Sequence, residues 1–599
     1  MTRGLTIVAY AVNGAGIGHL TRVLAVLRWM RRLALCAGRR LDAYVLTTSE
    51  AGQLALREGF ATFKLPSKTV VRAAGLPKED YLRVARQWVW HSLGLLNPDL
   101  LLVDTFPGGT FGELGPALDL PARKVFVSRA VKAGFDAAGF AAWLPYYDRI
   151  VTVVEPGAAR QATDNESYFA APPSVASSSG AERDEVADFG SDACGIEPDA
   201  GLAGWQATNG GALSSVAVAR TRYVSPILLR EPEACHDRTT ARRRLGVPDD
   251  AFALWLSAGG GGDPAAEQTL MALIDAFEAM PDVHLVVGAG PLYTGAPRRG
   301  PRLTWLTEPL AVEDFAGLDA AVSAAGFNTT YELLAMGVPT ALFAQEKIAD
   351  DQAARAARAA AAGAALWLPA GADGRPDAAA LRETFACLRD EATRVKLAAQ
   401  ARAFVPLGGA RQAAWYGLQL LLKHKELHAA VARATPRLCQ WLERQKLDAE
   451  QCARLWALTA AITDGDDLAE LLEQLPESFG LEDFLKFASR LPTLADAADL
   501  EAAFALWVRL AEALRPFGDA RGRVAFLQHL PWSRRASPDD QVRVIIRFLA
   551  AASAAGESLY RALSVLERHT AGAESDPWRW LTAVEAAARE VSDGLRAGA

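Results

Sequence analysis

Two residues at predicted helix starts are well suited to chemistry on a bound substrate. His19 ends the stretch AYAVNGAGIGH and is followed by a helical pattern to about residue 35. A helix N-terminus disfavours the imidazolium, so this imidazole should stay neutral and able to accept a proton. Glu332, within SAAGFNTTYELLAMGVP, has a carboxylate that can accept two hydrogen bonds from the vicinal hydroxyls of a ribose. The alternatives are that His19 has only a structural role, and that Glu332 is present because the helix dipole favours an acidic residue near a helix start.

The glycines before His19 do not form a dinucleotide fingerprint. They are Gly14, Gly16 and Gly18, whereas the pattern G-x-G-x-x-G needs a glycine at position 19. The alternative is that this glycine run forms a turn with a structural role only. Arg22, one helical turn after His19, is expected either to contact a negative charge or to lie on a solvated helix face.

A second glycine run, SAGGGG at residues 257–262, also follows an apolar strand. Its backbone N–H groups, with a helix N-terminus behind them, are expected to cradle phosphate oxygens. The residues predicted to do this are Gly259, Gly260 and Gly261. No G-K-[ST] follows, so the run is not a Walker A loop.

The segment at residues 323–356 is the most specific in the chain. Across its strand-to-helix junction it places Gly326, Asn328, Thr329, Thr330 and Glu332. Asp351 and Gln352 open the next helix at the same end of the sheet, where they are expected to bind sugar hydroxyls. The alternative for this pair is an exposed capping turn.

The elements that must position these residues alternate between strands and helices. Apolar runs such as LTIVAYAV and LLLVD, the second ending at Asp104, predict a parallel sheet covered on both faces. A second alternating series begins at AFALWLS, and ligands of such sheets lie at the carboxyl ends of strands. From about residue 424 the apolar spacing becomes helical throughout.

We therefore predict an α/β fold with two tandem Rossmann-like domains followed by an all-α domain. The predicted boundaries are 1–156, a flexible insertion at 157–222 that is rich in Ser, Gly and Ala, 223–423, and 424–599. A net charge of −7 gives no reason to expect nucleic-acid binding. Six scattered cysteines without a CxxC and no apolar run of 18 residues predict a soluble cytoplasmic protein without a zinc site.

At these motifs the chain resembles the GT-B glycosyltransferases of the family that includes MurG and the plant galactolipid synthases. NGAGIGH is similar to that family's GGTGGH loop, and SAAGFNTTYELLAMGVPTALF to its donor-binding signature. ADDQAARA and GGARQAAWYGLQLLL resemble the following D-x-Q or H-Q segment and the final helix that returns to the N-terminal domain. The likeness covers residues 1–155 and 223–423, about 60% of the chain.

The resemblance implies an inverting transfer of a sugar from a nucleotide diphosphate, in this family a UDP-sugar, with no metal or other cofactor. His19 would be the base, Glu332 would hold the ribose, and the opening loop with Arg22 and Asp104 would face the acceptor. The sequence departs from the family at Asp351 and at Arg355, where a histidine and an asparagine are usual. These departures leave the sugar and the base of the donor open.

Two other functions fit the same residues. GIGHLTR is similar to a G-x-G-H-x-x-R pattern of sugar-nucleotide hydrolases, and 2-epimerases share the GT-B architecture, so His19 could instead activate water. The chain could also be a scaffold that senses a nucleotide sugar and binds a partner through its helical domain. The acceptor, a lipid, a glycan, a protein or a small molecule, cannot be read from the sequence.

The helix after the first glycine loop allows a further interpretation. It combines Trp29 and Met30 with six arginines: Arg22, Arg28, Arg31, Arg32, Arg39 and Arg40. Basic and aromatic residues on one helix suit an anionic membrane surface, which predicts peripheral contact at the inner face of a membrane. We favour the alternative, a helix that covers the sheet and has a solvated face.

Overall fold

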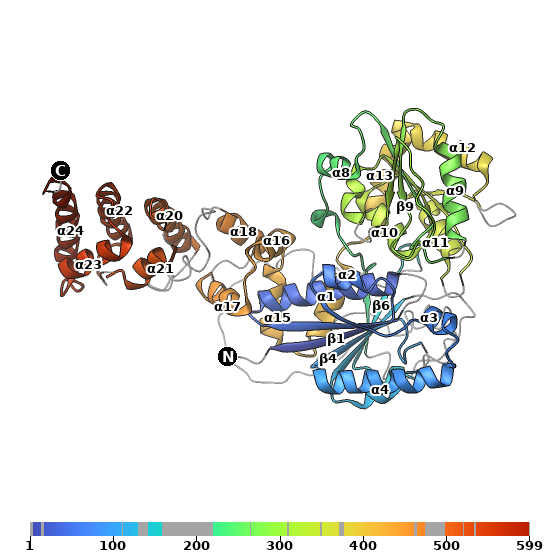
Figure 1. Cartoon of the computed structure of the whole chain (residues 1–599), viewed down its shortest axis with the longest axis horizontal. Coiled ribbons are helices and arrows are strands. Elements are labelled where there is room, and N and C mark those ends of the chain that lie inside the picture. The colour runs from blue at the N-terminus through green and yellow to red at the C-terminus, as the bar shows by residue number, and fades with distance from the viewer. Residues whose placement is uncertain are drawn as a thin grey trace, which may run out of the picture. The chain divides into compact units, whose positions relative to one another are not determined.

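The fold is taken from a computed structural model of the chain (Figure 1). The residues it describes are 4–12, 17–110, 112–129, 142–158, 220–263, 265–307, 311–347, 350–369, 376–459, 464–473, 497–518, 520–531, 533 and 535–597. Gly14, Gly16 and nearly all of the predicted insertion, residues 159–219, lie outside these ranges.

The first sheet contains seven parallel strands in the order β3-β2-β1-β4-β5-β6-β7. The strands are β1 (Leu5–Ala11), β2 (Leu41–Thr47), β3 (Ala61–Lys64), β4 (Leu100–Asp104), β5 (Arg123–Arg129), β6 (Arg149–Val153) and β7 (Thr221–Val224). β4 is buried along its whole length, as expected of a central strand covered on both faces. β7 pairs with β6, so residues up to Val224 belong to this sheet and correct the predicted start of the second domain at 223.

Helices from both ends of the α/β region cover this sheet. They are α1 (Gly18–Cys36), α2 (Gln53–Arg57), α3 (Lys68–Ala73), α4 (Lys78–Leu96), the 3-10 turns η1 (Gly115–Asp119) and η2 (Leu144–Tyr146), and α14 (Gly409–Leu418). α14 packs against β6 and β7, so the chain does return to the first sheet after completing the second. Its Gly409 is closely packed, because a Cβ there would lie 2.2 Å from the Ser225 carbonyl oxygen.

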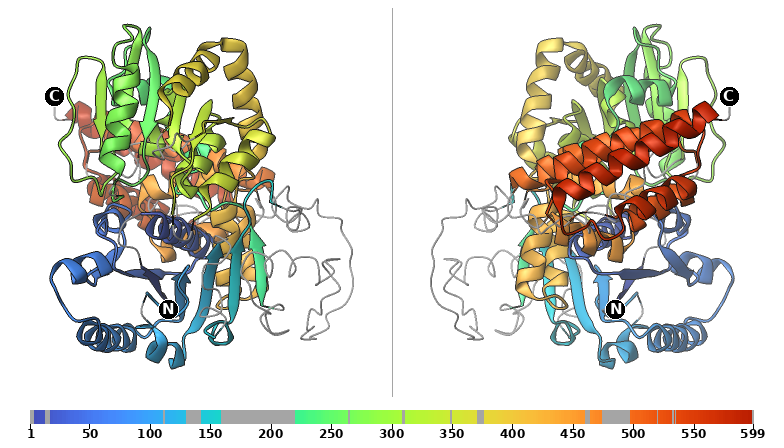
Figure 2. Two further views of the ribbon diagram at one scale, coloured as in Figure 1. Left: turned by 90° about the vertical axis from the view of Figure 1, so that its right-hand side faces the viewer. Right: turned by 90° about the vertical axis from the view of Figure 1, so that its left-hand side faces the viewer.

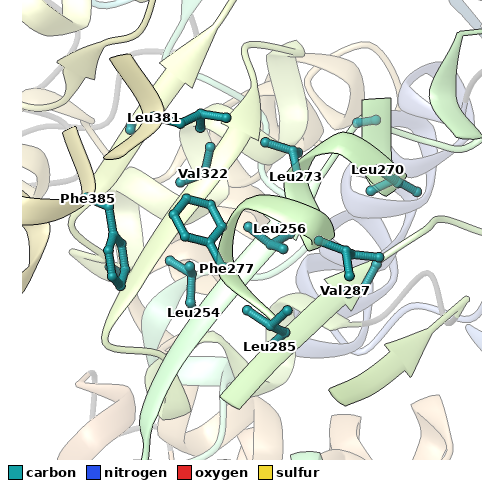
Figure 3. Close-up of a cluster of buried hydrophobic side chains, with 14 of the residues drawn as sticks. Leu254, Leu256, Leu270, Leu273, Phe277, Leu285, Val287, Val322, Leu381 and Phe385 are labelled. Atoms are coloured by element: carbon teal, nitrogen blue, oxygen red, sulfur yellow. The ribbon is translucent and has the colours of Figure 1, made fainter. Parts of the chain in front are cut away.

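The second sheet contains six parallel strands in the order β10-β9-β8-β11-β12-β13. They are β8 (Phe252–Ser257), β9 (Val283–Gly288), β10 (Leu303–Leu306), β11 (Ala320–Ala324), β12 (Thr340–Phe343) and β13 (Leu366–Trp367). Leucine and valine side chains of β8, β9 and β11 pack beneath α9, where Phe277 is fully buried (Figure 3). This core fixes the carboxyl ends of β8 and β11, from which the two glycine-containing loops emerge.

The helices around the second sheet occupy both of its faces, as a doubly wound fold requires. They are α8 (Arg238–Leu245), α9 (Ala266–Phe277), α10 (Phe327–Met336), α11 (Gln352–Ala361), α12 (Ala378–Arg389), α13 (Glu391–Phe404) and the turns η5 (Pro232–Ala234) and η6 (Ala311–Gly317). Gly337 ends α10 with a positive φ of 73°, which makes the sharp stop predicted from the GVP sequence.

The described residues after α14 are mainly helical, and the chain forms a second compact unit of residues 34–40 and 425–599. Its helices are α15 (His424–Arg433), α16 (Pro436–Gln445), α17 (Ala449–Leu458), α18 (Gly465–Glu473), α20 (Ala497–Leu514), α21 (Ala520–His529), α22 (Pro538–Ala554), α23 (Leu559–Thr570) and α24 (Pro577–Ala597). α22 packs between α20 and α24, and α23 packs against α21, so helices stack on their second neighbours (Figure 1). Figure 2 shows the C-terminal helices, coloured red, from two further sides. The predicted fold class, two parallel α/β sheets followed by a helical region, is confirmed.

α1 is a buried helix. Arg22, Arg28, Arg32 and Trp29 are each less than 9% exposed, so they form neither a solvated face nor a membrane-facing surface. Arg22 and Arg28 pack against the Asp104 carboxylate and the Leu229 carbonyl. Arg31, Arg39 and Arg40 of the predicted basic set are not buried, so peripheral membrane contact through them stays a prediction. No helix in the described parts of the chain is long and apolar enough to cross a bilayer.

Candidate functional site

One cleft brings the predicted residues of both sheets together. Its cavity volume is about 260 Å³, and it opens to solvent. The first domain lines it with Gly18, His19, Thr21, Arg22 and Arg129, and the second with loops after β8, β9, β11 and β12. These are carboxyl ends of parallel strands, the usual ligand position in open α/β sheets.

His19 lies in the first turn of α1 and is held from behind by Asp104. Its Nδ1 is 2.6 Å from Oδ2 of Asp104 at the end of β4, and 2.9 Å from the hydroxyl oxygen of Thr105. The Asp104 carboxylate is fully buried, and the imidazole is 13% exposed. A proton on Nδ1 directed at the carboxylate leaves Nε2 as the ring nitrogen with a free lone pair, which suits a base.

Arg22 completes this arrangement. Its Nε donates to Oδ1 of Asp104 at 2.9 Å, and its Nη2 donates to Oδ2 at 2.8 Å. The contact with a negative charge that the sequence suggested is thus made, but to a carboxylate of the same chain. Arg22 and the His19 hydrogen bond hold the pKa of Asp104 well below its usual range, against the desolvation that opposes them.

Burial is the main cause that lowers the pKa of His19 from 6.5, and nearby Arg22 and Arg129 act in the same direction. The Asp104 hydrogen bond opposes this shift without reversing it. The predicted neutrality of the imidazole therefore agrees with its environment, in which desolvation disfavours the charged form. A neutral imidazole near pH 7 can accept a proton.

Glu332 lies on the cleft side of α10 in the second domain and is 9% exposed. Desolvation raises the pKa of its carboxyl to about 7, and the Leu229 N–H, 3.4 Å from Oε1, and Arg230 only partly offset this. A buried carboxylate with one long hydrogen bond has acceptor capacity to spare. Paired hydroxyls of a ligand would supply the missing donors.

The second glycine loop approaches the loop after β9 closely. A Cβ on Gly290 would lie 2.4 Å from the Gly260 carbonyl carbon, so a side chain there would clash with backbone. Gly259 has a φ of 96° and open space around its Cβ position, on the cleft side. Beside this loop, Lys347 forms an ion pair with Asp263, and both side chains line the cleft.

Several polar atoms at the cleft lack partners within the described residues. They are Oδ1 of Asn328, Nε2 of Gln345, Nε1 of Trp255 and Nε of Arg129. Buried polar groups are normally hydrogen-bonded, so unpartnered ones that face one cavity indicate a place for a polar ligand. Asn328 also donates from Nδ2 to the Thr21 hydroxyl, which joins the two sides of the cleft.

Most predicted site residues meet at this cleft. Its lining includes Gly18, His19, Arg22, Gly259, Gly260, Gly326, Asn328, Thr329, Glu332 and Gln352, with Asp104 directly behind His19. Gly261, Thr330 and Asp351 are not part of the lining. Asp351 caps α11 by accepting a hydrogen bond from Ala354 N–H, and its neighbour Asp350 faces the cleft instead.

Sequence reasoning missed a set of buried charges beside the cleft. Arg129, the last residue of β5, pairs with Asp350 at 2.8 Å. Arg355, the family departure, pairs with the same carboxylate at 2.8 Å and with Glu155 at 2.7 Å. Arg129 and Glu155 come from the first domain, so the network joins both domains. The position of Arg129 at a strand's carboxyl end was the one signal the sequence offered.

Two tandem Rossmann-like domains with a shared cleft and a returning helix are the arrangement of the GT-B fold. The chain therefore has a GT-B-like fold. No family model matches the chain. It is similar to a transferase of Desulforudis audaxviator (strain MP104C) named UDP-N-acetylglucosamine–N-acetylmuramyl-(pentapeptide) pyrophosphoryl-undecaprenol N-acetylglucosamine transferase, with 33% identity over 138 residues. That match covers 21% of this chain and 37% of the relative's own length.

Solved structures give more distant likenesses. MurG of Acinetobacter baumannii is 15% identical with a TM-score of 0.41, covering 70% of this chain and 100% of that one. UGT89C1 of Arabidopsis thaliana complexed with UDP is 13% identical with a TM-score of 0.42, covering 72% and 99%. A UDP-N-acetylglucosamine 2-epimerase is 10% identical with a TM-score of 0.41, covering 68% and 94%.

Proposed function

We propose that the protein is a glycosyltransferase that moves a sugar from a nucleotide diphosphate to an acceptor hydroxyl with inversion. The observation that carries this proposal is the position of one histidine. His19, with Asp104 behind its Nδ1, faces the same cleft as Glu332 and the glycine loop at Gly259. A histidine suited to act as a base and a surface suited to bind a nucleotide thus face one cavity, from opposite domains.

In the proposed reaction, Nε2 of His19 removes the proton of the acceptor hydroxyl. The oxygen attacks the anomeric carbon from the face opposite the diphosphate, and the bond to the diphosphate breaks. Asp104 stabilises the imidazolium that forms, as a buried carboxylate does for a catalytic histidine. A general base of this kind contributes roughly 10²–10⁴-fold to the rate.

On the donor side, Glu332 accepts hydrogen bonds from the ribose hydroxyls, and the backbone around Gly259 and Gly260 receives the diphosphate. Lys347 supplies a positive charge beside that loop. The uridine base is proposed from the bacterial relative, whose name specifies UDP-N-acetylglucosamine. The same proposal includes a sugar-binding role for Gln352. Asp351 could bind the sugar only if its carboxylate accepted hydrogen bonds both from the sugar and from the Ala354 N–H that it caps.

The test begins with a thermal-shift panel of nucleotide diphosphates and UDP-sugars to find the donor. A ligand at about 100 times its Kd stabilises by about 2.7 kcal/mol. Release of the nucleotide is then followed for His19→Ala and for His91→Ala, a control on the exposed face of α4. We expect His19→Ala to lose roughly 10²-fold or more in kcat, with donor Kd unchanged. Full turnover by His19→Ala would contradict the proposed base.

The same assay separates transfer from the alternatives on this fold. Rapid stoichiometric release of free sugar without an acceptor would favour a hydrolase, in which His19 activates water. Donor binding without turnover on any acceptor would favour a nucleotide-sugar-binding scaffold. Glu332→Ala tests the donor side separately, since unchanged donor affinity in that variant would remove the ribose contact.

A further inference from the structure

Thr105, directly after the carboxylate that holds His19, has an unusual backbone. Its φ is 61°, in the left-handed region that β-branched residues avoid. The other non-glycine residues with positive φ in the described parts are Asn97 and Lys446, which end α4 and α16 as left-handed caps. Thr105 ends no helix, so its conformation needs another explanation.

The backbone around Thr105 is held in place on both sides. The Phe106 N–H donates to the Asp104 carbonyl at 2.7 Å, which closes a three-residue turn around Thr105. The Thr105 N–H donates to the Val127 carbonyl at 2.9 Å. Turns of this kind with positive φ at the central residue are rare and strained. Glycine would adopt the turn without strain, so the threonine side chain must contribute something that glycine lacks.

What the side chain contributes is a hydroxyl inside the charged cluster. Oγ1 of Thr105 donates to Oδ2 of Asp104 at 2.8 Å and accepts a hydrogen bond from Nη2 of Arg22 at 3.0 Å. It also lies 2.9 Å from Nδ1 of His19. The hydroxyl is therefore in contact with all three members of the cluster.

These contacts bear on which ring nitrogen of His19 carries the proton. Nη2 of Arg22 lies 3.1 Å from Nδ1 of His19, and a guanidinium can only donate. If Arg22 donated to Nδ1, the proton would sit on Nε2, and the nitrogen facing the cleft could not act as a base. The Thr105 hydroxyl accepts one Nη2–H of Arg22. Oδ2 of Asp104, 2.6 Å from Nδ1, is placed to accept a proton carried on that nitrogen.

We propose that Thr105 is a positioning residue whose hydroxyl, fixed by the strained turn, accepts an Nη2–H of Arg22 in competition with Nδ1 of His19 and so keeps the imidazole proton on Nδ1. The proposal deepens the assignment of His19 as a base and rests on it for its catalytic meaning. The tautomer itself is a property of the protein without substrate, so it can be measured whatever reaction the cleft performs.

The experiment compares three variants of the full-length chain. Thr105→Ser keeps the hydroxyl, Thr105→Gly removes it and relieves the backbone strain, and Thr105→Val removes it while keeping the shape of the side chain. The chain has eight histidines, so ¹³C,¹⁵N-histidine-labelled protein is studied by solid-state NMR and the His19→Gln spectrum identifies the His19 signals. The ring carbon shifts report which nitrogen is protonated. The groups that face His19 are Asp104, Arg22 and Arg129, and spectra are recorded at about pH 8, where the imidazole is neutral.

We expect wild type and Thr105→Ser to carry the proton on Nδ1, and Thr105→Gly and Thr105→Val to show a measurable Nε2–H population. With a donor in hand, the latter two should lose about tenfold or more in kcat while donor KM stays unchanged. A purely structural Thr105 would leave the tautomer unchanged in both variants, and that result overturns the proposal, as would an Nε2–H tautomer in wild type. If the tautomer shifts as expected but wild type transfers no sugar, the proposed function fails while the positioning role stands.

Discussion

Burial of the Glu332 carboxyl makes stability and ligand binding compete at a single residue. Desolvation raises its pKa from 4.5 to about 7, so the folded state holds a proton that the unfolded chain releases between these values. Because the folded state then binds more protons, stability falls as the pH rises from about 4.5 through 7. The full difference corresponds to roughly 3 kcal/mol, at 1.36 kcal/mol for each pKa unit.

Glu332→Gln should therefore stabilise the protein without ligand at about pH 8 by up to roughly 3 kcal/mol, and have little effect at about pH 4.5. The amide has nearly the same shape and carries no charge. The same variant should bind UDP more weakly, because the amide can accept from fewer hydroxyls. Urea unfolding across this pH range and calorimetric titration with UDP measure the two effects. A stability difference that does not depend on pH would contradict the assignment of the raised pKa.

At the residue scale, the sequence could predict side chains whose chemistry depends on local position. His19 and Glu332 follow glycine-containing strand ends, and that placement was sufficient to predict that both would face one cleft. Thr105 and Lys347 could not be found in this way, because each acquires its role from a partner far away in the chain. No local pattern encodes that Arg22 reaches Thr105 across 83 residues.

Among the strand-to-helix loops, Gly326 offers a substitution that separates ligand contact from folding. It caps α10 with φ −64° and ψ 144°, values that any residue adopts, and no atom lies within 4 Å of a Cβ built there. We expect Gly326→Ala to cost less than about 1 kcal/mol of stability, as for other cap exchanges. Its methyl group would enter the cleft, so donor affinity should fall severalfold in a calorimetric titration.

Gly94→Ala is the matched control for this substitution. Gly94 lies within α4, also with open space around its Cβ position and no place in the cleft lining. Alanine in a helix interior should stabilise by about 0.5–1 kcal/mol without changing donor affinity. Equal donor affinities in both variants would show that the ligand does not approach Gly326.

At the element scale, the alternation of apolar strands with helices was readable because parallel strands are buried on both faces. The predicted boundary at 222 and 223 divided the edge strand β7 between the insertion and the second domain, since TRYVSPILLR follows the long insertion and its sequence does not indicate the sheet to which it belongs. Its pairing with β6 is a long-range contact that crosses residues 159–219. Hydrophobic periodicity predicts a strand, but it does not predict the strand with which it pairs.

At the scale of the whole molecule, the sequence suggested a division at residue 424, and the compact units divide next to that point. It could not suggest that Ala34–Arg40 belong with the helical unit. α1 runs from His19 in the first unit to Cys36 in the second, so one continuous helix is shared by both. The apolar pattern of α1 is uniform, so the sequence does not show that its last residues belong to a different compact unit.

Within the helical unit, Trp456 holds the end of α1. Its Nε1 donates to the Leu35 carbonyl at 3.0 Å, Arg433 lies 5.3 Å from its ring centroid, and the side chain is buried. Nearby, a hydrogen bond with Cys439 and burial raise the pKa of the Cys36 thiol, which favours the thiol over the reactive thiolate. We expect Trp456→Ala to cost about 3–5 kcal/mol, as for other buried tryptophans.

The measurement is the rate at which a thiol reagent labels Cys36, located by mass spectrometry after digestion. Loosening the packing around α1 should expose Cys36 by local opening and raise its labelling rate in Trp456→Ala. Trp578→Ala is the control, because Trp578 belongs to the same unit and is 79% exposed, and exposed substitutions usually change stability by less than about 0.5 kcal/mol. Equal labelling of Cys36 in the two variants would mean that the helical unit does not hold this end of α1.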